Sequence, residues 1–462
     1  MKPVRRTLCV LLISALAGAA CGGSKDGGST ATTAAAVETT TAGDGSATTA
    51  AATGGAGDFG DLLAVCGPGS AKGATDQGVT DSQIEVGTIS DPGNTIIPGL
   101  NQELFDAADA FVGWCNDAGG ILGRTIKLNK RDAKLVEAGP RMVEACQTDF
   151  MLVGNGEALD DTTVKPRTNC GLAEIAAYTV STRAGRAENS ILAIPNTDYQ
   201  SHLTGIYRQI QAKDPAVVPF FGELNSQLPA LNTSGKRNAQ AAVDLGFTQV
   251  YYEETPMAVD NWRTYAENIK KAGVQVLSME DTPENTASLL RALSDVGYFP
   301  KYLVMEANHY NAKFVEEAGA ALDQTTVLIN TGQVPFEISG PDYPATEQFI
   351  ALLKKYANAE PKALAINAFS SWLLWAVSAK ACGDTLTRAC VMGKASATTN
   401  WTAGGLHAKE TPGNGGGTDS ACFLALQATS KGFVVNSDFT NATEGLFNCD
   451  PKNVATVSGF AP

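Results

Sequence analysis

Histidine is scarce in this chain, and the motifs of common catalytic sites are missing. The 462 residues include His202, His309 and His407, at spacings that fit no metal site. There is no G-x-S-x-G and no H-E-x-x-H motif. We therefore expect the histidines to be surface or loop residues. The sequence predicts no enzyme, no catalytic residue, no metal and no cofactor.

Positive charge is also in short supply. Lys and Arg total 34 against 48 Asp and Glu, which gives a formal net charge of −14. Removal of residues 1–20 would take away three positive charges and bring the net charge to −17. Because so acidic a body repels phosphate backbones, nucleic-acid binding is not expected.

No apolar run at the N-terminus is long enough to span a bilayer. Basic residues up to Arg6 precede an apolar run from Leu8 to Ala17, and small residues follow up to Cys21. This is the pattern of an export signal. The end of the segment, Gly-Ala-Ala-Cys, resembles a bacterial lipoprotein box and predicts lipidation of Cys21, so that residues 1–20 are a signal peptide. A plain secretory signal with a coincidental cysteine is the alternative.

Large apolar residues are almost absent from residues 21–58, which are mostly Gly, Ala, Ser and Thr. Such a segment cannot bury enough surface to offset its ordering entropy. We therefore expect a disordered tether with a reach of roughly 35 Å. The protein would be exported and lipid-anchored on the outer face of the cell membrane, or periplasmic.

Cysteine is present in a pattern that favours disulfides. Eight cysteines lie beyond Cys21, and none form a C-x-x-C pair. An even number in an exported chain indicates disulfides rather than zinc or redox chemistry. Eight cysteines allow 105 pairings, and closeness in sequence favours three pairs and leaves a fourth. The predicted pairs are Cys146–Cys170, Cys382–Cys390, Cys422–Cys449 and Cys66–Cys115.

Short β-rich runs alternate with helical patterns from Gly78 onward. This alternation predicts βα units around a parallel sheet, and its restart after residue 198 predicts a second α/β lobe. The length of 462 residues suits two cores, since single cores rarely exceed roughly 250 to 300 residues. The predicted strands are 83–89, 124–129, 149–155, 172–177, 191–196, 216–223, 248–254, 274–280 and 301–306.

Three glycine-containing stretches invite comparison with phosphate loops. Gly119 and Gly120 follow a helical pattern and precede a strand, whereas a phosphate loop needs strand, glycines and then helix. We expect a corner there. The segment 154–159 has G-x-G after a strand but lacks the third glycine, and Ser234 to Arg237 lacks two residues of a P-loop. Neither predicts a nucleotide site, but 154–159 stays open as a loop at a strand's carboxyl end that presents backbone N–H groups to a small anionic ligand.

Two later segments carry further expectations. Residues 366–383 form a strongly apolar helical run, and we expect its Trp372 and Trp375 to pack in the core rather than to line a ligand site. Residues 404–420 are rich in glycine, which predicts a long connection.

Three stretches together resemble a known family. GVTDSQIEVGTISD, NDAGGILGRTIKLNKRDAK and AGPRMVEACQTDFMLVGNG are similar to the start of extracellular solute-binding proteins of the Leu/Ile/Val-binding type. These are receptors of ABC importers with the type I periplasmic-binding-protein fold. The resemblance covers roughly residues 78–455 and is strongest in the first lobe. It implies two doubly wound parallel-sheet lobes joined by crossovers, 78–197 with 330–412 and 198–329 with 413–462.

The resemblance also implies a small-molecule ligand held between the lobes, an importer permease as partner, and a monomer. This chain departs from the family where amino acids bind. The loop GNGEALDD lacks the usual serine pair, and Glu280, Asp281 and Thr282 replace tyrosines. The departures speak against a standard branched-chain amino acid. By position, the expected contacts are Ser90, Asp91, Asn94, Asn155, Glu157, Tyr178, Thr179, Tyr199, Asn225, Asp281, Thr282 and Glu306.

Three functions stay open at this point. The first is a membrane-tethered receptor that delivers a small polar metabolite, such as an amino acid or amide, to an importer. The second is a sensor subunit on the same fold that reports ligand to a signalling partner. The third is an exported hydrolase whose Ser, His and Asp come together only in three dimensions.

Overall fold

The computed structural model describes residues 55–460, apart from 196–200, 257, 339 and 419. The signal peptide, Cys21, most of the predicted tether and Tyr199 lie outside the described residues. No helix in the described part combines the length and apolar character that crossing a bilayer requires.

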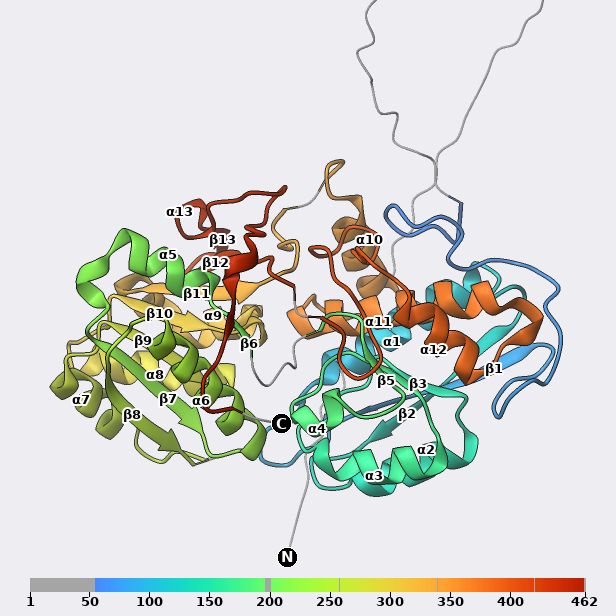
Figure 1. Ribbon diagram of the computed structural model, residues 1–462, viewed down its shortest axis with the longest axis horizontal. Helices are drawn as coiled ribbons and strands as arrows, with labels where there is room; N and C mark the ends of the chain where they lie inside the picture. The colour runs from blue at the N-terminus through green and yellow to red at the C-terminus, as the bar shows by residue number, and fades with distance from the viewer. Residues whose placement is uncertain (1–54, 196–200, 257, 339, 419, 461–462) are drawn as a thin grey trace, which may run out of the picture. The chain divides into compact units, whose positions relative to one another are not determined.

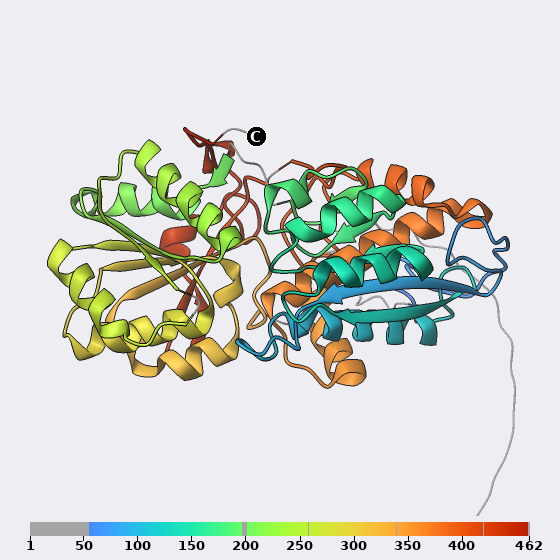
Figure 2. The same ribbon diagram turned by 90° about the horizontal axis from the view of Figure 1, so that it is seen from below.

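The first lobe is built on five parallel strands in the order β2-β1-β3-β4-β5. Helices α1 and α11 cover one face and share a single apolar core with the sheet, and α2 and α3 cover the other (Figures 1 and 2). The strands are β1 Gln83–Ser90, β2 Thr125–Asp132, β3 Met151–Val153, β4 Glu174–Ala176 and β5 Ser190–Leu192. The helices are α1 Gln102–Asp117, α2 Ala138–Thr148, α3 Asp161–Cys170, α4 Thr182–Gly185, α10 Pro344–Leu352, α11 Ala363–Cys382 and α12 Arg388–Ser396.

The second lobe has a seven-stranded sheet in the order β13-β12-β11-β10-β9-β7-β8. Helices α7, α8 and α9 pack on one face, and α5 and α6 pack on the other. Its strands are β7 Phe221–Ser226, β8 Gln249–Thr255, β9 Val276–Glu280, β10 Tyr302–Met305, β11 Thr326–Thr331, β12 Leu424–Thr429 and β13 Gly432–Val435. Its helices are α5 Gly205–Lys213, α6 Pro229–Asp244, α7 Trp262–Ala272, α8 Pro283–Asp295, α9 Ala312–Ala318 and α13 Ser437–Thr440.

The two-sheet α/β prediction is confirmed, with two differences in the second lobe. Strands β11, β12 and β13 were not predicted, and the last two run antiparallel at one edge. The strand predicted at 216–223 begins only at Phe221, because Pro215–Val217 form a 3-10 turn. Pro219 lacks the N–H that a ladder requires, which favours the later start.

The expected corner after α1 is confirmed, and the structure shows what fixes it. Gly119 and Gly120 adopt φ values of +107° and +73°, where side chains other than glycine are strained. The Asn116 side chain donates to the Ile126 carbonyl (2.9 Å) and accepts from the Ile126 N–H (2.7 Å). The end of the helix is thereby tied to the start of β2.

Residues 55–79, here called the strap, pack on this corner and on the core of the first lobe. The Gly67 N–H donates to the Gly120 carbonyl (2.7 Å), and Cys66 is disulfide-bonded to Cys115 of α1. Phe59 is fully buried against Trp114. Residues 55–58 were predicted as the end of the tether. They instead form a turn that is the first part of the strap.

All eight cysteines beyond Cys21 are paired in the structure. The disulfides are Cys66–Cys115, Cys146–Cys170, Cys382–Cys390 and Cys422–Cys449.

The strap predicts a stability effect. Phe59→Ala removes a fully buried ring, so we expect a loss of about 3 to 5 kcal/mol in the free energy of unfolding, measured by urea denaturation. Leu63→Ala, four residues away on a side chain that is 77% exposed, is the control and should change stability by about 0.5 kcal/mol or less. Equal urea-denaturation midpoints for Phe59→Ala and Leu63→Ala would show that the strap is not part of the core.

Candidate functional site

Polar side chains gather where the parallel strands of each sheet end. Ligands of open α/β sheets bind outside these carboxyl ends. In the first lobe this edge is formed by the loops after β1, β3 and β4. In the second lobe it is formed by the ends of β7, β9, β10 and β11.

The loop after β1 is held by hydrogen bonds within the protein. Ser90 Oγ donates to the Asn101 carbonyl (2.9 Å). The fully buried Asp91 carboxylate accepts from the backbone N–H groups of Leu135 and Ala158, both at 2.8 Å. Ser90 and Asp91 therefore position loops. Asn94 Nδ2 is buried, and no residue in the described part of the chain accepts from it.

The loop after β3 approaches two aromatic side chains closely. A Cβ on Gly154, whose φ is +63°, would lie 2.8 Å from Trp372 Nε1. A Cβ on Gly156 would lie 2.4 Å from the Tyr178 ring. The glycines of this G-x-G thus allow contact with aromatic rings. Trp372 and Trp375 are fully buried, as the core interpretation predicts.

Side chains from the loops after β3 and β4 leave hydrogen-bonding atoms in the interior. Asn155 Nδ2 donates to Glu174 (3.2 Å), while Asn155 Oδ1 has no donor among the described residues. Thr179 Oγ1 is likewise buried without a described partner. The Tyr178 hydroxyl accepts from Asn101 Nδ2 (2.6 Å). Asn101 was not predicted from the sequence.

Glu157 lies in the same region, in an acidic environment. It is 3% exposed, and its Oε1 has no partner in the described part of the chain. Burial raises the pKa of Glu157 well above its usual range, and nearby Glu174, Asp160 and Asp91 add to the rise. Burial also raises the pKa of Asp160 to about 6, although its carboxylate accepts from backbone N–H groups.

In the second lobe, four polar residues stand at one level across neighbouring strands. Asn225 at the end of β7 is in register with Glu280 of β9. The registers of the next strands put Glu306 and Asn330 at the same level after β10 and in β11. Asn225 is fully buried, whereas the Glu306 side chain is 31% exposed, so the row reaches solvent at Glu306.

The acids of this row have little positive charge beside them to offset their own. Burial raises the pKa of Glu280 to about 8, and the charge of Glu306 adds to the rise. Burial also raises the pKa of Glu306 to about 7. Arg237 of α6 lies beside both acids, and its charge offsets part of these increases. Glu223, two residues before Asn225, is fully buried with no hydrogen-bond partner for either oxygen among the described residues.

The close approach of α6 explains Gly235, which the sequence offered only as part of a failed P-loop pattern. A Cβ on Gly235 would lie 1.9 Å from Asn225 Oδ1. Because Gly235 has no side chain, α6 can lie directly over the row of polar residues. This places Arg237 beside Glu280 and Glu306. The sequence did not reveal this role, because it depends on helix-to-sheet contact.

Asp281 and Thr282 have structural partners. Asp281 accepts from Thr255 Oγ1 (2.7 Å), the Thr282 N–H (2.7 Å) and Asn285 Nδ2 (2.8 Å). Thr282 caps α8 by accepting from the Asn285 N–H (3.3 Å). The predicted cap is confirmed. Glu280 was not among the expected contacts, although the sequence offers it with Asp281 and Thr282 in place of the family's tyrosines, and it stands in the row of polar residues.

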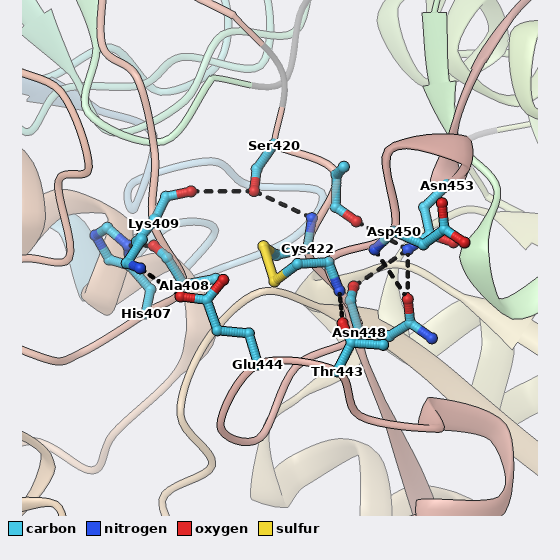
Figure 3. The surroundings of a disulfide bond; sticks show 12 residues. His407, Ala408, Lys409, Ser420, Cys422, Thr443, Glu444, Asn448, Asp450 and Asn453 are labelled. Carbon is cyan, nitrogen blue, oxygen red and sulfur yellow. Dashed lines mark hydrogen bonds and ion pairs between the residues drawn. A yellow bond between two sulfur atoms is a disulfide. The ribbon is translucent and has the colours of Figure 1, made fainter.

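Two of the connections between the sheets meet in one polar network around Asn453, and Figure 3 shows the part of it beside the Cys422–Cys449 disulfide. In the first connection, the Thr204 N–H and Oγ1 donate to the Asn453 carbonyl (2.7 and 3.0 Å). Asn453 Nδ2 donates to the Ala421 carbonyl (2.9 Å) in the connection that leads to β12, where Cys422 forms its disulfide with Cys449. The short strands β6 Ser201–Leu203 and β14 Val454–Thr456 pair beside this network.

The histidines were expected to be surface or loop residues; His309 and His407 do lie in connections, but all three histidines are largely buried rather than at the surface. His309 and His407 are 1% and 3% exposed, and the His202 side chain is 10% exposed. Ser370 Oγ lies 2.9 Å from His407 Nε2, and His407 Nδ1 lies 2.7 Å from the Ala408 carbonyl. Ser370 is fully buried and accepts from Trp401 Nε1 (2.9 Å). The pair thus has neither an acid partner nor access to a substrate.

Neither a metal-binding cluster nor a surface hollow adds a candidate site in the described part of the chain. The described residues include no cluster of three or more His, Cys, Asp or Glu side chains that could hold a metal ion. A hollow of about 600 Å³ opens at the amino ends of the second sheet, lined by residues such as Lys301 and Thr326. None of the predicted site residues lines it, and the buried polar side chains lie at the other end of the strands.

Both lobes carry polar residues at the carboxyl ends of their parallel strands, where ligands of open α/β sheets bind. A model of the family described as periplasmic binding protein matches residues 224–432. The match covers less than half of the chain, and over that segment the sequence is similar to periplasmic binding proteins. No curated protein matches the sequence.

Solved structures share the fold at low identity. A fatty acid ABC transporter substrate-binding protein from Thermomonospora curvata aligns with a TM-score of 0.68 and 17% identity over 84% of this chain and 97% of that one. A leucine-binding protein from Thermotoga maritima gives 0.62 and 13%, over 76% and 97%. A branched-chain amino acid transporter substrate-binding protein from Streptococcus pneumoniae, in complex with isoleucine, gives 0.59 and 14%, over 77% and 100%.

The raised pKa values predict that the unliganded protein loses stability as pH rises. Folded Glu280 keeps its proton up to a pH of about 8, whereas the unfolded side chain releases it near 4.5. Between these values the folded state binds more protons, so the free energy of unfolding falls with increasing pH. Thermal unfolding across this range should show the fall, and Glu280→Gln should make it shallower. An unchanged slope in the variant would contradict the assignment.

Proposed function

We propose that the protein is a membrane-tethered receptor outside the cytoplasm that captures a small polar solute between its two lobes and delivers it to an ABC importer. One observation carries the proposal. The carboxyl ends of both sheets hold buried polar atoms without described partners, among them Asn94 Nδ2, Asn155 Oδ1 and Asn330 Oδ1. Buried polar groups of native proteins are normally hydrogen-bonded, and a solute would supply the missing partners.

The contacts divide into binding and positioning roles. Asn155, Glu157 and Thr179 bind from the first lobe, with Asn94 and Tyr178 beside them. Glu280 and Glu306 bind from the second lobe, with Asn225 and Asn330 at the same level. Ser90, Asp91, Asp281 and Thr282 hold the loops, because their hydrogen bonds are made within the protein.

Binding would work by stabilising one arrangement of the lobes. A solute that contacts both lobes has more favourable contacts when they close on it, and this difference in affinity shifts the population. The network around Asn453 and the Cys422–Cys449 disulfide would keep the connections together during the movement. Hydrogen bonds to the buried acids gain strength as water is excluded.

The solute can be sought directly. Native mass spectrometry of the full-length protein, purified in detergent, should show a noncovalent mass that is lost on unfolding. Glu306→Gln should weaken binding of that solute by about 10-fold or more, because it removes a charged partner. Glu316→Gln changes an exposed acid of the same lobe and is the control. Failure to retain or bind any solute in a screen of amino acids, amides, amines and small acids would contradict the proposal.

The tether makes a separate prediction. Cys21→Ala should prevent lipidation and release the protein from the membrane fraction, as followed by fractionation and immunoblotting. Cys9→Ala changes another cysteine of the leader and should leave the protein membrane-bound. Full membrane retention of the Cys21 variant would contradict the lipid anchor.

A further inference from the structure

The first lobe carries four acids close together and one basic side chain among them. Glu157 lies near Asp91, Asp160 and Glu174, with Arg167 as the nearby cation. Arg167 forms a buried ion pair with Glu174 at 3.1 Å. The cluster therefore has an excess of acidic groups at the place where a solute would enter.

Three of the four acids are already compensated. Asp91 accepts from two backbone N–H groups at 2.8 Å. Asp160 accepts from the N–H groups of Val180 and Ser181. Glu174 is paired with Arg167 and accepts from Ser190 Oγ at 2.8 Å. Glu157 is the exception, because its Oε1 has no hydrogen-bond partner among the described residues.

Two more buried acceptors belong to the same loops, after β3 and β4. Asn155 Oδ1 and Thr179 Oγ1 are buried and lack described partners. The amide of Asn155 is oriented by the bond from its Nδ2 to Glu174, so its oxygen is the free atom. Together with Glu157 Oε1, these atoms suit the three N–H donors of an ammonium group.

The second lobe also has more acidic than basic side chains at its site. Glu223, Glu280 and Glu306 are accompanied by Arg237 and by His202. His202 is held neutral, because burial lowers its pKa to about 3, with a further contribution from Arg237. Three acids therefore face one permanent cation.

A carboxylate on the solute would meet basic side chains that already lie beside acids, as far as the described residues at these loops show. The basic side chains Arg167, Arg237 and Lys362 lie at these loops, and each one lies beside an acid. Lys362 Nζ, for example, is 3.2 Å from Glu103 Oε2. A carboxylate placed against Glu157 would instead bring two acids together without a counter-charge, which is unfavourable in a buried site.

We propose that the solute is a small organic dication, such as a linear diamine, with one cationic group held by each lobe and no carboxylate. This inference rests on the proposed function and specifies its substrate class. One ammonium binds Glu157, Asn155 and Thr179, and the other binds Glu280 and Glu306. The site then differs in charge from one that holds an amino acid, whose carboxylate needs a donor.

Binding is coupled to the release of a proton. Burial raises the pKa of Glu157, and Asp91, Asp160 and Glu174 raise it further while Arg167 opposes them. These effects favour the protonated form of the carboxyl in the unliganded protein. When the cation binds, the O–H bond of Glu157 breaks, the proton passes to the buffer, and the carboxylate pairs with the ammonium.

The test is isothermal titration calorimetry of the full-length protein in detergent. The probes are 1,4-diaminobutane, 4-aminobutanoate and 1,4-butanediol, which share a chain length and differ in end groups, with 1,3-diaminopropane and 1,5-diaminopentane to vary the spacing. We expect a diamine to bind about 10-fold or more tightly than the amino acid and the diol. Its binding heat should depend on the ionisation enthalpy of the buffer.

Glu157→Gln keeps the shape of the side chain and removes its charge. It should weaken diamine binding about 10- to 100-fold and reduce the proton release, of which Glu280 in the other lobe would supply the remainder. Glu188→Gln, an exposed acid of the same lobe, should change neither. Because the probe series is run on the unaltered protein, it tests the inference even if the Glu157 variant misfolds.

The outcomes separate this inference from the proposed function. If the amino acid or the diol binds as tightly as the diamines, or if the retained solute carries a carboxylate, the receptor function stands and the dication inference is wrong. The same holds if the protein binds another solute and no diamine. If no solute is retained or bound at all, the receptor function itself fails.

Discussion

The strongest constraint on this protein is the burial of acidic side chains where parallel strands end. Parallel strands direct their carboxyl ends to one edge, so polar residues that follow them are brought together. Here Glu157 in one lobe, and Glu223 with Glu280 in the other, are buried with too few basic partners. Isolated buried charges are costly, so these groups hold protons or await a cation.

The rest of the structure supports these two edges. In the first lobe, Asp91 and Asp160 hold the loops through backbone N–H groups, and the glycines of the loop after β3 admit Trp372 and Tyr178. In the second, Gly235 lets α6 approach the sheet closely enough to place Arg237 over the acids. The strap lies at the other end of the first lobe, where it packs on the corner between α1 and β2.

Local pattern was sufficient to predict most of the framework. The strand and helix alternation gave both sheets, the glycines after α1 gave the corner, and Thr282 gave a helix cap. Contacts between distant segments were not predictable from local pattern. The antiparallel pair β12 and β13 and the packing of the strap depend on such contacts.

Site prediction was limited for the same reason. The positions after each strand were identified by order along the chain, but order does not show which side chains already have partners. Asp281 proved to be hydrogen-bonded within its lobe, whereas its neighbour Glu280 stands in the polar row. Glu223 and Arg237 were missed, because only the packing of α6 on β7 and β9 shows that they belong together.

Hydrogen–deuterium exchange with and without the bound solute tests most directly whether both edges form one site. The account predicts that a single solute protects the loop after β3, around Glu157, and the ends of β9 and β10, around Glu280 and Glu306, at the same concentration. Protection confined to one lobe, or centred on the amino ends of the strands, would contradict it.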